Sequence, residues 1–243
     1  DYGRALVRLD NGRIFMDGEG YSGTVFAGAV WEFNDDGDLI NTWHFAPDGS
    51  SGYMGFHNIL LTLDNHLVMN GGGYYETNNH DGYIVKCDLN GNLVWQNILQ
   101  YDNWQHMTDV CEGLDGSLYF VGNSEVYAGS DGHPWHGKIS SAGATEFTHT
   151  YGNSGGYSYL LAVKQDTDGD WLLGGRFEAE GSQHQDALLL KVDHDDGNVI
   201  WEMFEGDDTP GSDEGFSEII VLDEESYMLA GDGDFGEIVY PAF

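Results

Sequence analysis

The chain has 243 residues, 40% of them hydrophobic, with 8 lysines and arginines against 42 aspartates and glutamates and a formal net charge of −34 at pH 7. This excess of acid argues strongly against nucleic acid or an anionic membrane surface as a partner, because both are bound by basic surfaces. No stretch reaches the roughly 18–20 apolar residues that a membrane-spanning helix needs.

From the N-terminus, short apolar runs alternate with polar, glycine-containing turns, and no window has the sustained 3.6-residue spacing of a helix. The pattern predicts four strands in each of four repeats and three in a fifth. The predicted strands are 4–9, 13–17, 28–33 and 39–45; 58–63, 67–70, 83–87 and 93–99; 108–112, 117–121, 137–140 and 145–150; 159–164, 171–174, 187–193 and 199–204; and 217–222, 227–230 and 236–240.

The repeat is marked by turn glycines that separate its third and fourth strands. Gly37, Gly91, Gly143 and Gly197 follow one another at intervals of 52 to 54 residues. A period near fifty with this strand content indicates a propeller-type repeat. We therefore expect an all-β fold, a β-propeller of about five four-stranded blades with the last blade incomplete. It forms a single domain over 1–243 with repeats at approximately 1–53, 54–104, 105–155, 156–213 and 214–243.

The fifth repeat lacks its fourth strand, so its last strand leaves an edge at Gly236, Glu237, Ile238, Val239 and Tyr240. An open edge can pair with another chain, giving a ring or a filament. The alternatives are a three-stranded blade or further chain beyond Phe243.

Two segments carry a resemblance to a known group of proteins. Lys86, Asp88, Gly91 and Trp95 recur as Lys191, Asp193, Gly197 and Trp201, and the segment 115–122 reads DGSLYFVG. This pattern resembles bacterial secreted β-propeller repeat proteins of the PQQ-like and lipoprotein type. The resemblance implies that Trp95 and Trp201 pack between blades, and it implies no particular activity.

Three carboxylates alternate around a glycine at Asp166, Asp168 and Asp170, an arrangement that can supply several oxygens to calcium. A plain hairpin turn is the alternative. Histidines in the loops between second and third strands suggest a transition-metal site, against the alternative of solvated loop histidines. These histidines are His80, His133, His136 and His184.

Aromatic residues at loops and strand entries are candidates for binding, by stacking on sugars or anchoring a protein interface. The alternative is that they pack between blades. They are Tyr74, Tyr75, Trp104, Tyr127 and Trp135.

Together these patterns favour a non-catalytic structural or binding protein, secreted or displayed on a cell surface, whose partners are a glycan or further copies of itself. The competing hypothesis is a carbohydrate-active enzyme of glycosidase or lyase type that uses carboxylates at the propeller face. No catalytic residue is assigned, and calcium is the one cofactor considered. Extracellular location is expected from the acidity and from a chain that starts without Met. Cys87 and Cys111 are either a disulfide or two thiols.

Overall fold

The computed structural model describes residues 2–22, 25–47, 50–75, 80–100, 104–125, 132–152, 156–182, 184–206, 212–223 and 226–233. Regular structure in these ranges consists of β-strands, and the described part of the chain has no helix long and apolar enough to cross a membrane. The chain divides into two compact units. The first comprises Asp1–Val110 and Ser141–Ala144, and the second comprises Cys111–Ser140 and Thr145–Phe243.

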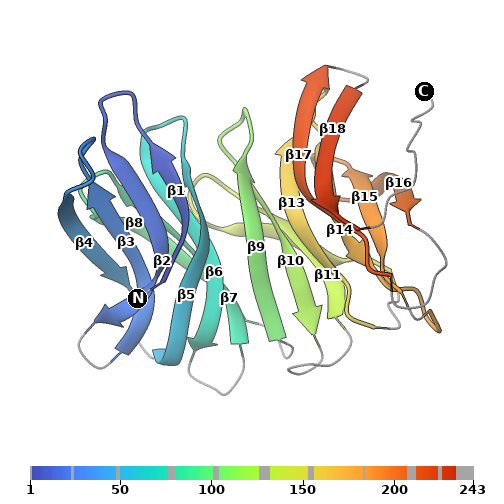
Figure 1. The fold of residues 1–243 in the computed structure, drawn as a ribbon, viewed down its shortest axis with the longest axis horizontal. Helices are drawn as coiled ribbons and strands as arrows, with labels where there is room; N and C mark the ends of the chain where they lie inside the picture. Colours follow the sequence, from blue (N-terminus) through green and yellow to red (C-terminus); the bar gives the residue numbers. More distant parts are fainter. Residues whose placement is uncertain are drawn as a thin grey trace. The chain divides into compact units, whose positions relative to one another are not determined.

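The first unit contains two successive antiparallel meanders of four strands each (Figure 1). The first meander is β1 (Tyr2–Arg8), β2 (Ile14–Ser22), β3 (Val25–Phe33) and β4 (Leu39–Phe45), and the second is β5 (Ser50–Leu61), β6 (His66–Tyr75), β7 (His80–Asp88) and β8 (Leu93–Leu99). A single parallel pairing, Phe26 with Tyr53, joins β3 to β5, so the eight strands form one sheet. β9 (Trp104–Glu112) begins in this unit.

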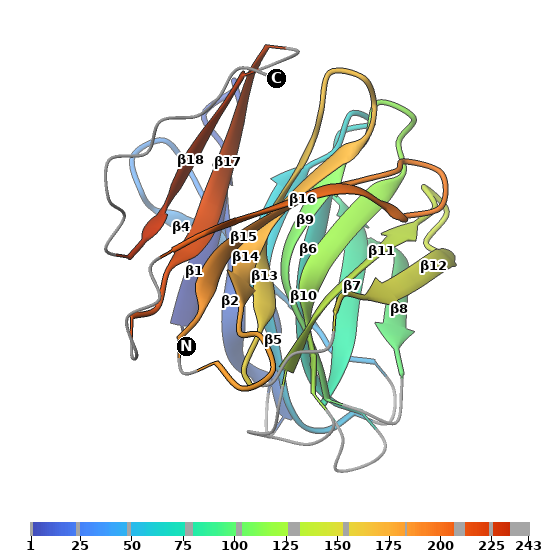
Figure 2. The ribbon, with the colours of Figure 1, turned by 90° about the vertical axis from the view of Figure 1, so that its right-hand side faces the viewer.

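The second unit repeats the same meander, as can be followed in Figures 1 and 2. Its strands are β10 (Leu118–Glu125), β11 (Gly132–Ile139), β12 (Thr145–Thr150), β13 (Tyr159–Gln165), β14 (Trp171–Phe177), β15 (Asp186–Val192), β16 (Val199–Glu205), β17 (Gly215–Asp223) and β18 (Ser226–Asp232). β13 to β16 form a four-stranded antiparallel sheet, and β17 and β18 form a two-stranded one. The predicted all-β repeat is thus confirmed as a series of antiparallel meanders.

The third strand of a meander is buried along most of its length. The segment from Tyr83 to Cys87 on β7 is buried throughout, as is Ala187 to Val192 on β15. A strand with neighbours on both sides and packing on both faces reads as a continuous apolar run, which is why these segments stood out in the sequence. The fourth strands alternate between exposed and half-buried side chains instead.

An aromatic residue of one repeat packs against the turn glycine of the next. Gly91 has φ +79°, and a Cβ added there would lie 2.4 Å from the Trp43 ring. Gly143 has φ +88°, and the Trp95 ring lies in the same relation to it. Trp95 also donates a hydrogen bond from Nε1 to the Ser141 carbonyl at 3.1 Å. These turns therefore need glycine twice over, for the left-handed backbone and for the ring beside it.

Three further sequence expectations concern the edge strand, the two cysteines and the number of domains. The predicted edge strand Gly236–Tyr240 lies outside the described residues. Cys87 is a buried thiol whose pKa burial raises to about 12, and Cys111 is a half-buried thiol; both are free in the structure. The expectation of a single domain stays a prediction, and the structure is described here as two compact units.

Replacing Gly91 by alanine should lower the free energy of unfolding by about 2–4 kcal/mol, because the left-handed backbone and the overlap with Trp43 both add cost. Gly37 is the matched control. It has φ +84° but nothing within 4 Å of an added Cβ, so Gly37→Ala should cost about 1 kcal/mol. Urea unfolding of both variants measures the difference, and equal losses would contradict the packing role of Trp43.

Candidate binding site

Three neighbouring strands and the end of a fourth bring six aromatic and imidazole rings together in the first unit. The contacts run continuously from ring to ring, with centroids 4.3 to 6.4 Å apart. We call this group the ring cluster. It consists of Tyr53 and His57 on β5, Tyr74 on β6, His80 on β7, and Trp104 and His106 on β9.

Two of the aromatics predicted to bind lie in this cluster. Tyr74 and Trp104 meet edge to face, with ring centroids 5.9 Å apart and an interplanar angle of 76°. His80 lies against both, 5.5 Å from Tyr74 and 5.0 Å from Trp104. Tyr74 and Trp104 are half-buried, whereas His80 is 6% exposed. The two aromatics thus present part of their surface to solvent from a base of packed rings, the geometry that favours stacking of a ligand.

Backbone carbonyls hold two of the imidazoles in place. His80 donates from Nδ1 to the Gln105 carbonyl at 2.9 Å, and His57 donates from Nδ1 to the Met107 carbonyl at 3.3 Å. Because a carbonyl only accepts, both rings carry their proton on Nδ1. The ring orientations are therefore set by β9 itself.

An ion pair lies beside the ring cluster, and burial sets the protonation of several of its rings. Glu19 on β2 pairs with Arg4 at 3.3 Å and accepts the Tyr53 hydroxyl hydrogen bond. Burial and this carboxylate raise the pKa of Tyr53 to about 12, so the phenol keeps its proton. Burial lowers the pKa of His57, and it lowers that of His106 well below the usual range. At neutral pH the Tyr53 phenol and the His57 and His106 imidazoles are therefore uncharged.

Trp135 was also expected to be a binding residue, but the structure buries it. Its exposed fraction is 3%, and its ring lies 4.6 Å from that of Phe120 in the second unit. The reason is that β11 starts at Gly132 and takes in Pro134 and Trp135, which the sequence analysis had placed in a loop. Trp135 is therefore a packing residue, the alternative to binding given above. The side chains of Tyr75 and Tyr127 lie outside the described residues.

The predicted calcium turn holds a lysine instead. Lys191 on β15 places its Nζ 2.6 Å from the Asp166 carboxylate and 2.5 Å from that of Asp168. Asp166 also accepts a hydrogen bond from the Tyr227 hydroxyl at 2.7 Å. The positive charge that these carboxylates require comes from within the chain. Burial alone would raise the pKa of Asp166, but the bonds from Lys191 and Tyr227 outweigh it and lower the pKa.

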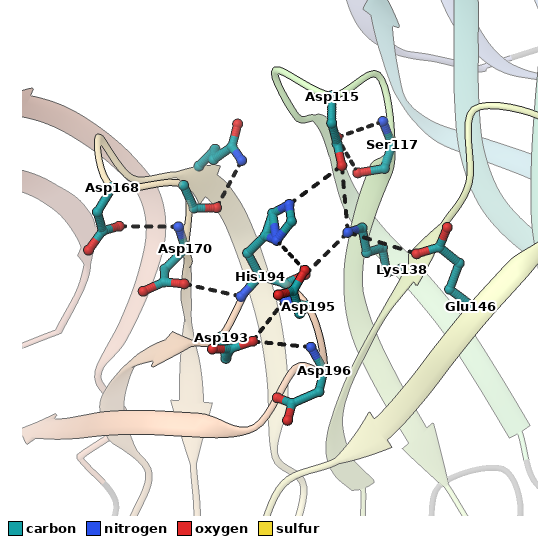
Figure 3. A network of polar contacts seen from close by, with 12 residues as sticks. Asp115, Ser117, Lys138, Glu146, Asp168, Asp170, Asp193, His194, Asp195 and Asp196 are labelled. Atoms are coloured by element: carbon teal, nitrogen blue, oxygen red, sulfur yellow. Dashed lines mark hydrogen bonds and ion pairs between the residues drawn. The ribbon is translucent and has the colours of Figure 1, made fainter.

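Asp170, the third predicted ligand, faces a different group. Its Oδ1 accepts a hydrogen bond from the His194 backbone N–H at 3.1 Å, as Figure 3 shows. His194 lies 3.5 Å from Asp115 and 3.0 Å from Asp195, while Lys138 lies between Asp115 and Glu146. Within the described ranges, no three His, Cys, Asp or Glu side chains are arranged to hold a metal ion.

The lysine–aspartate contact recurs in other repeats. Lys86 on β7 pairs with Asp64 at 2.8 Å, and Lys138 on β11 pairs with Asp115 at 3.6 Å. Each aspartate lies in the turn between the first and second strands of its repeat. The first repeat reverses the charges, since Glu32 on β3 takes the place of the lysine and pairs with Arg13 at 2.6 Å. The lysines of the sequence pattern are therefore structural.

Three of the histidines considered for a transition-metal site, His136, His184 and His80, have partners within the protein. His136 is 1% exposed, bonds the Tyr119 hydroxyl through Nδ1 at 2.8 Å, and has its pKa lowered to about 3 by burial. His184 lies 3.5 Å from Asp186. His80 belongs to the ring cluster.

Sequence reasoning missed His57 and His106, because it searched the loops between second and third strands. Both residues lie on first strands, β5 and β9, 49 residues apart. An interval close to the repeat period was the signal that could have placed them side by side.

Comparison with known proteins supports the fold class. No protein-family model and no curated protein matches the sequence. Among solved structures, a protein of unknown function from Dyadobacter fermentans has a TM-score of 0.63 at 12% identity over 96% of this chain and 72% of its own. Virginiamycin B lyase from Staphylococcus aureus has a TM-score of 0.50 at 12% identity over 98% of this chain and 71% of its own.

A protein of unknown function from Bacteroides caccae has a TM-score of 0.49 at 10% identity over 84% of this chain, which spans 65% of that protein's length. At such identities the Dyadobacter and Staphylococcus structures show fold alone. The protein has an all-β, propeller-like fold. The finer resemblance to PQQ-like repeats has no sequence match behind it.

Replacing Lys191 by methionine should destabilise the protein by about 3 kcal/mol, because it leaves the buried Asp166 carboxylate without its cation. The estimate is at the low end for such losses, since Tyr227 and Thr167 still bond Asp166. Lys164→Met is the control. Lys164 forms a 3.6 Å ion pair with Glu218 that is exposed on both sides, so its loss should cost less than about 1 kcal/mol.

The pH dependence of this effect has a definite sign. In the natural chain the folded-state pKa of Asp166 is lowered, so its stabilisation is present at neutral pH and is lost as the pH falls through that value. In Lys191→Met burial remains without the lysine, so the folded-state pKa is raised and protonation stabilises the variant. Chemical denaturation should show the deficit shrinking as the pH falls toward about 4. A deficit that does not vary with pH would contradict the assignment.

Proposed function

We propose that this protein is a non-catalytic binding protein of the propeller type, secreted or displayed at a cell surface, whose ligand is an uncharged glycan. The observation that carries the proposal is the convergence of Tyr74 and Trp104 in the ring cluster. They come from different repeats, they meet edge to face, and both remain half-buried.

The chemistry of the cluster favours a flat, partly apolar ligand. Sugar rings present C–H faces that stack on aromatic side chains, and their hydroxyls bond neutral polar groups. The His57 and His106 imidazoles and the Tyr53 phenol are neutral at physiological pH, and the chain carries a net charge of −34. An anionic sugar would be repelled by this field, whereas an uncharged one is unaffected.

Binding is favoured over catalysis by the state of the adjacent carboxylate. Glu19 accepts from Arg4 and Tyr53 and is 5% exposed, so it is held as a structural group. A glycosidase needs two carboxyl groups facing the scissile bond.

Replacing Trp104 by alanine should weaken binding of a neutral oligosaccharide by about 2 kcal/mol, roughly thirtyfold in Kd, because truncating a central aromatic removes the stacking surface. Calorimetry on a ligand selected from a neutral glycan array measures this, with Trp104→Phe retaining most of the affinity. Tyr2→Ala, a change at a residue that is 65% exposed in the same unit, is the control.

Two outcomes would overturn the proposal. One is an absence of neutral glycan binding by the folded chain, or binding that Trp104→Ala leaves unchanged. The other is cleavage of the bound glycan, which would favour the carbohydrate-active enzyme instead.

We infer further that the repeats are blades of a five-bladed propeller whose last blade is incomplete and can pair with a second copy. The two-stranded β17–β18 sheet supports this, beside four meanders of four strands. The segment that would pair, 236–240, lies outside the described residues. Light scattering and negative-stain microscopy of the full chain test it: rings or filaments support edge pairing, and a monomer at high and low salt contradicts it.

A further inference from the structure

Neighbouring repeats within each unit pack against one another in one order. The first strand of a repeat lies against strands of the repeat before it: β5 against β1 and β2, β13 against β10 and β11, and β17 against β13 and β14. Each junction buries a residue of that first strand together with a residue of the preceding second strand. These pairs are Ile59 with Phe15, Val163 with Tyr119, and Ile219 with Leu172. A repeat thus has a leading face, which packs on the repeat before it, and a trailing face, which packs on the repeat after it.

The leading face of the first repeat is open to solvent at Leu6. The strand register gives the equivalent position in three other repeats, where it is held by Ile59, Val163 and Ile219. Those residues are 5%, 0% and 0% exposed, whereas Leu6 is 64% exposed. Met16, which pairs with Leu6 on the same face, is half-buried. Leu6 is therefore a junction residue without its junction.

The trailing face of the fifth repeat is open in the same way. Met228 pairs with Ile220 across β17 and β18, and the two side chains are 54% and 48% exposed. The position of Met228 is held in three other repeats by Phe15, Val68 and Leu172, each 0% exposed. The surface that covers a trailing face at the described junctions is a leading face of the same pattern, so a leading face fits here as well.

Charge favours the same combination. β1 carries Arg4 and Arg8 and no acidic residue, whereas β17 and β18 carry three acidic residues and no basic one. Two copies of a chain with a net charge of −34 repel one another over most of their surface, but a basic strand and an acidic sheet attract. Both arginines also contact carboxylates of their own repeat, Glu19 and Asp35. The apolar side chains therefore supply the attraction, and charge selects which faces meet.

We propose that the leading face of the first repeat, at Leu6 and Met16, packs on the trailing face of the fifth repeat, at Ile220 and Met228, of a second copy of this chain. The contact is heterologous, so each copy keeps a further face for the next one, and the assembly is a ring or a filament according to whether the rotation closes. The inference rests on the part of the proposed function that places a second copy at the fifth repeat. It uses side chains on the face of the sheet instead of the strand edge at 236–240.

Sedimentation velocity of the full chain between about 1 and 100 µM tests the contact, with association expected to grow with concentration. Leu6→Lys and Met228→Lys should each weaken it at least about tenfold, because each variant would bury an unpaired ammonium group. Both residues are exposed in the single chain, so the circular dichroism spectrum should not change. Leu93→Lys is the matched control, a change at a 50% exposed leucine on β8, and it should leave association unchanged.

Mixing the two lysine variants tests the head-to-tail arrangement. Leu6→Lys keeps its trailing face, and Met228→Lys keeps its leading face, so the mixture should form one-to-one dimers that neither variant forms alone. A natural chain that stays monomeric, association that survives both substitutions, or a mixture that stays monomeric would overturn the proposal.

Removal of residues 236–243 separates this contact from edge pairing. Association that survives the removal but is lost in both lysine variants supports the face contact and contradicts edge pairing. The reverse result overturns the face contact and supports edge pairing. Glycan binding is measured separately, and its absence would leave this inference standing.

Discussion

The structure depends on the ion pairs that its few basic side chains form. Each of its eight basic side chains forms an ion pair within the chain. Three of them, Lys86, Lys138 and Lys191, are buried on third strands and held by aspartates in the preceding hairpin turns. A buried ammonium that lost its carboxylate would be strongly destabilising. The hairpin turn and the third strand of these repeats are therefore held together by an ion pair whose loss would be costly in stability.

The same shortage of basic residues determines the charge of the surface. Eight basic residues cannot balance 42 acidic ones, so the chain keeps a net charge of −34. The excess charge keeps molecules apart and selects against anionic partners. The ring cluster, which we propose as the binding site, contrasts with this surface because it is built from aromatic and imidazole rings rather than carboxylates.

Whether a feature of the structure could be predicted from the sequence depends on how far apart in the chain the interacting residues lie. Strand–turn–strand periodicity is local, so the turn glycines, the apolar third strands and the packing of Trp95 could all be predicted. Which residue of a distant strand a side chain contacts is not determined by its neighbours in the sequence. Asp166 and Asp168 had the composition of a calcium loop, and only the register of β15 shows that Lys191 fills it.

The same limit applies to the candidate site. Tyr74 and Trp104 were identifiable as aromatics at strand entries, but their meeting depends on two repeats lying in register. Trp135 had the same local context and is buried instead, because β11 extends through it. His57 and His106 were missed because nothing within either strand marks a histidine as part of a pair.

The reversed pair of the first repeat has a consequence for how the repeats find their places. When repeats share one strand pattern, a hairpin of one repeat resembles the hairpins that belong on the third strands of the others. Arg13 on such a hairpin would meet Lys86, Lys138 or Lys191 at the foreign strand, and two buried ammonium or guanidinium groups without a carboxylate are strongly disfavoured. The Arg13–Glu32 inversion therefore gives the first repeat a hairpin whose charge does not match the third strands of the repeats that carry lysine there.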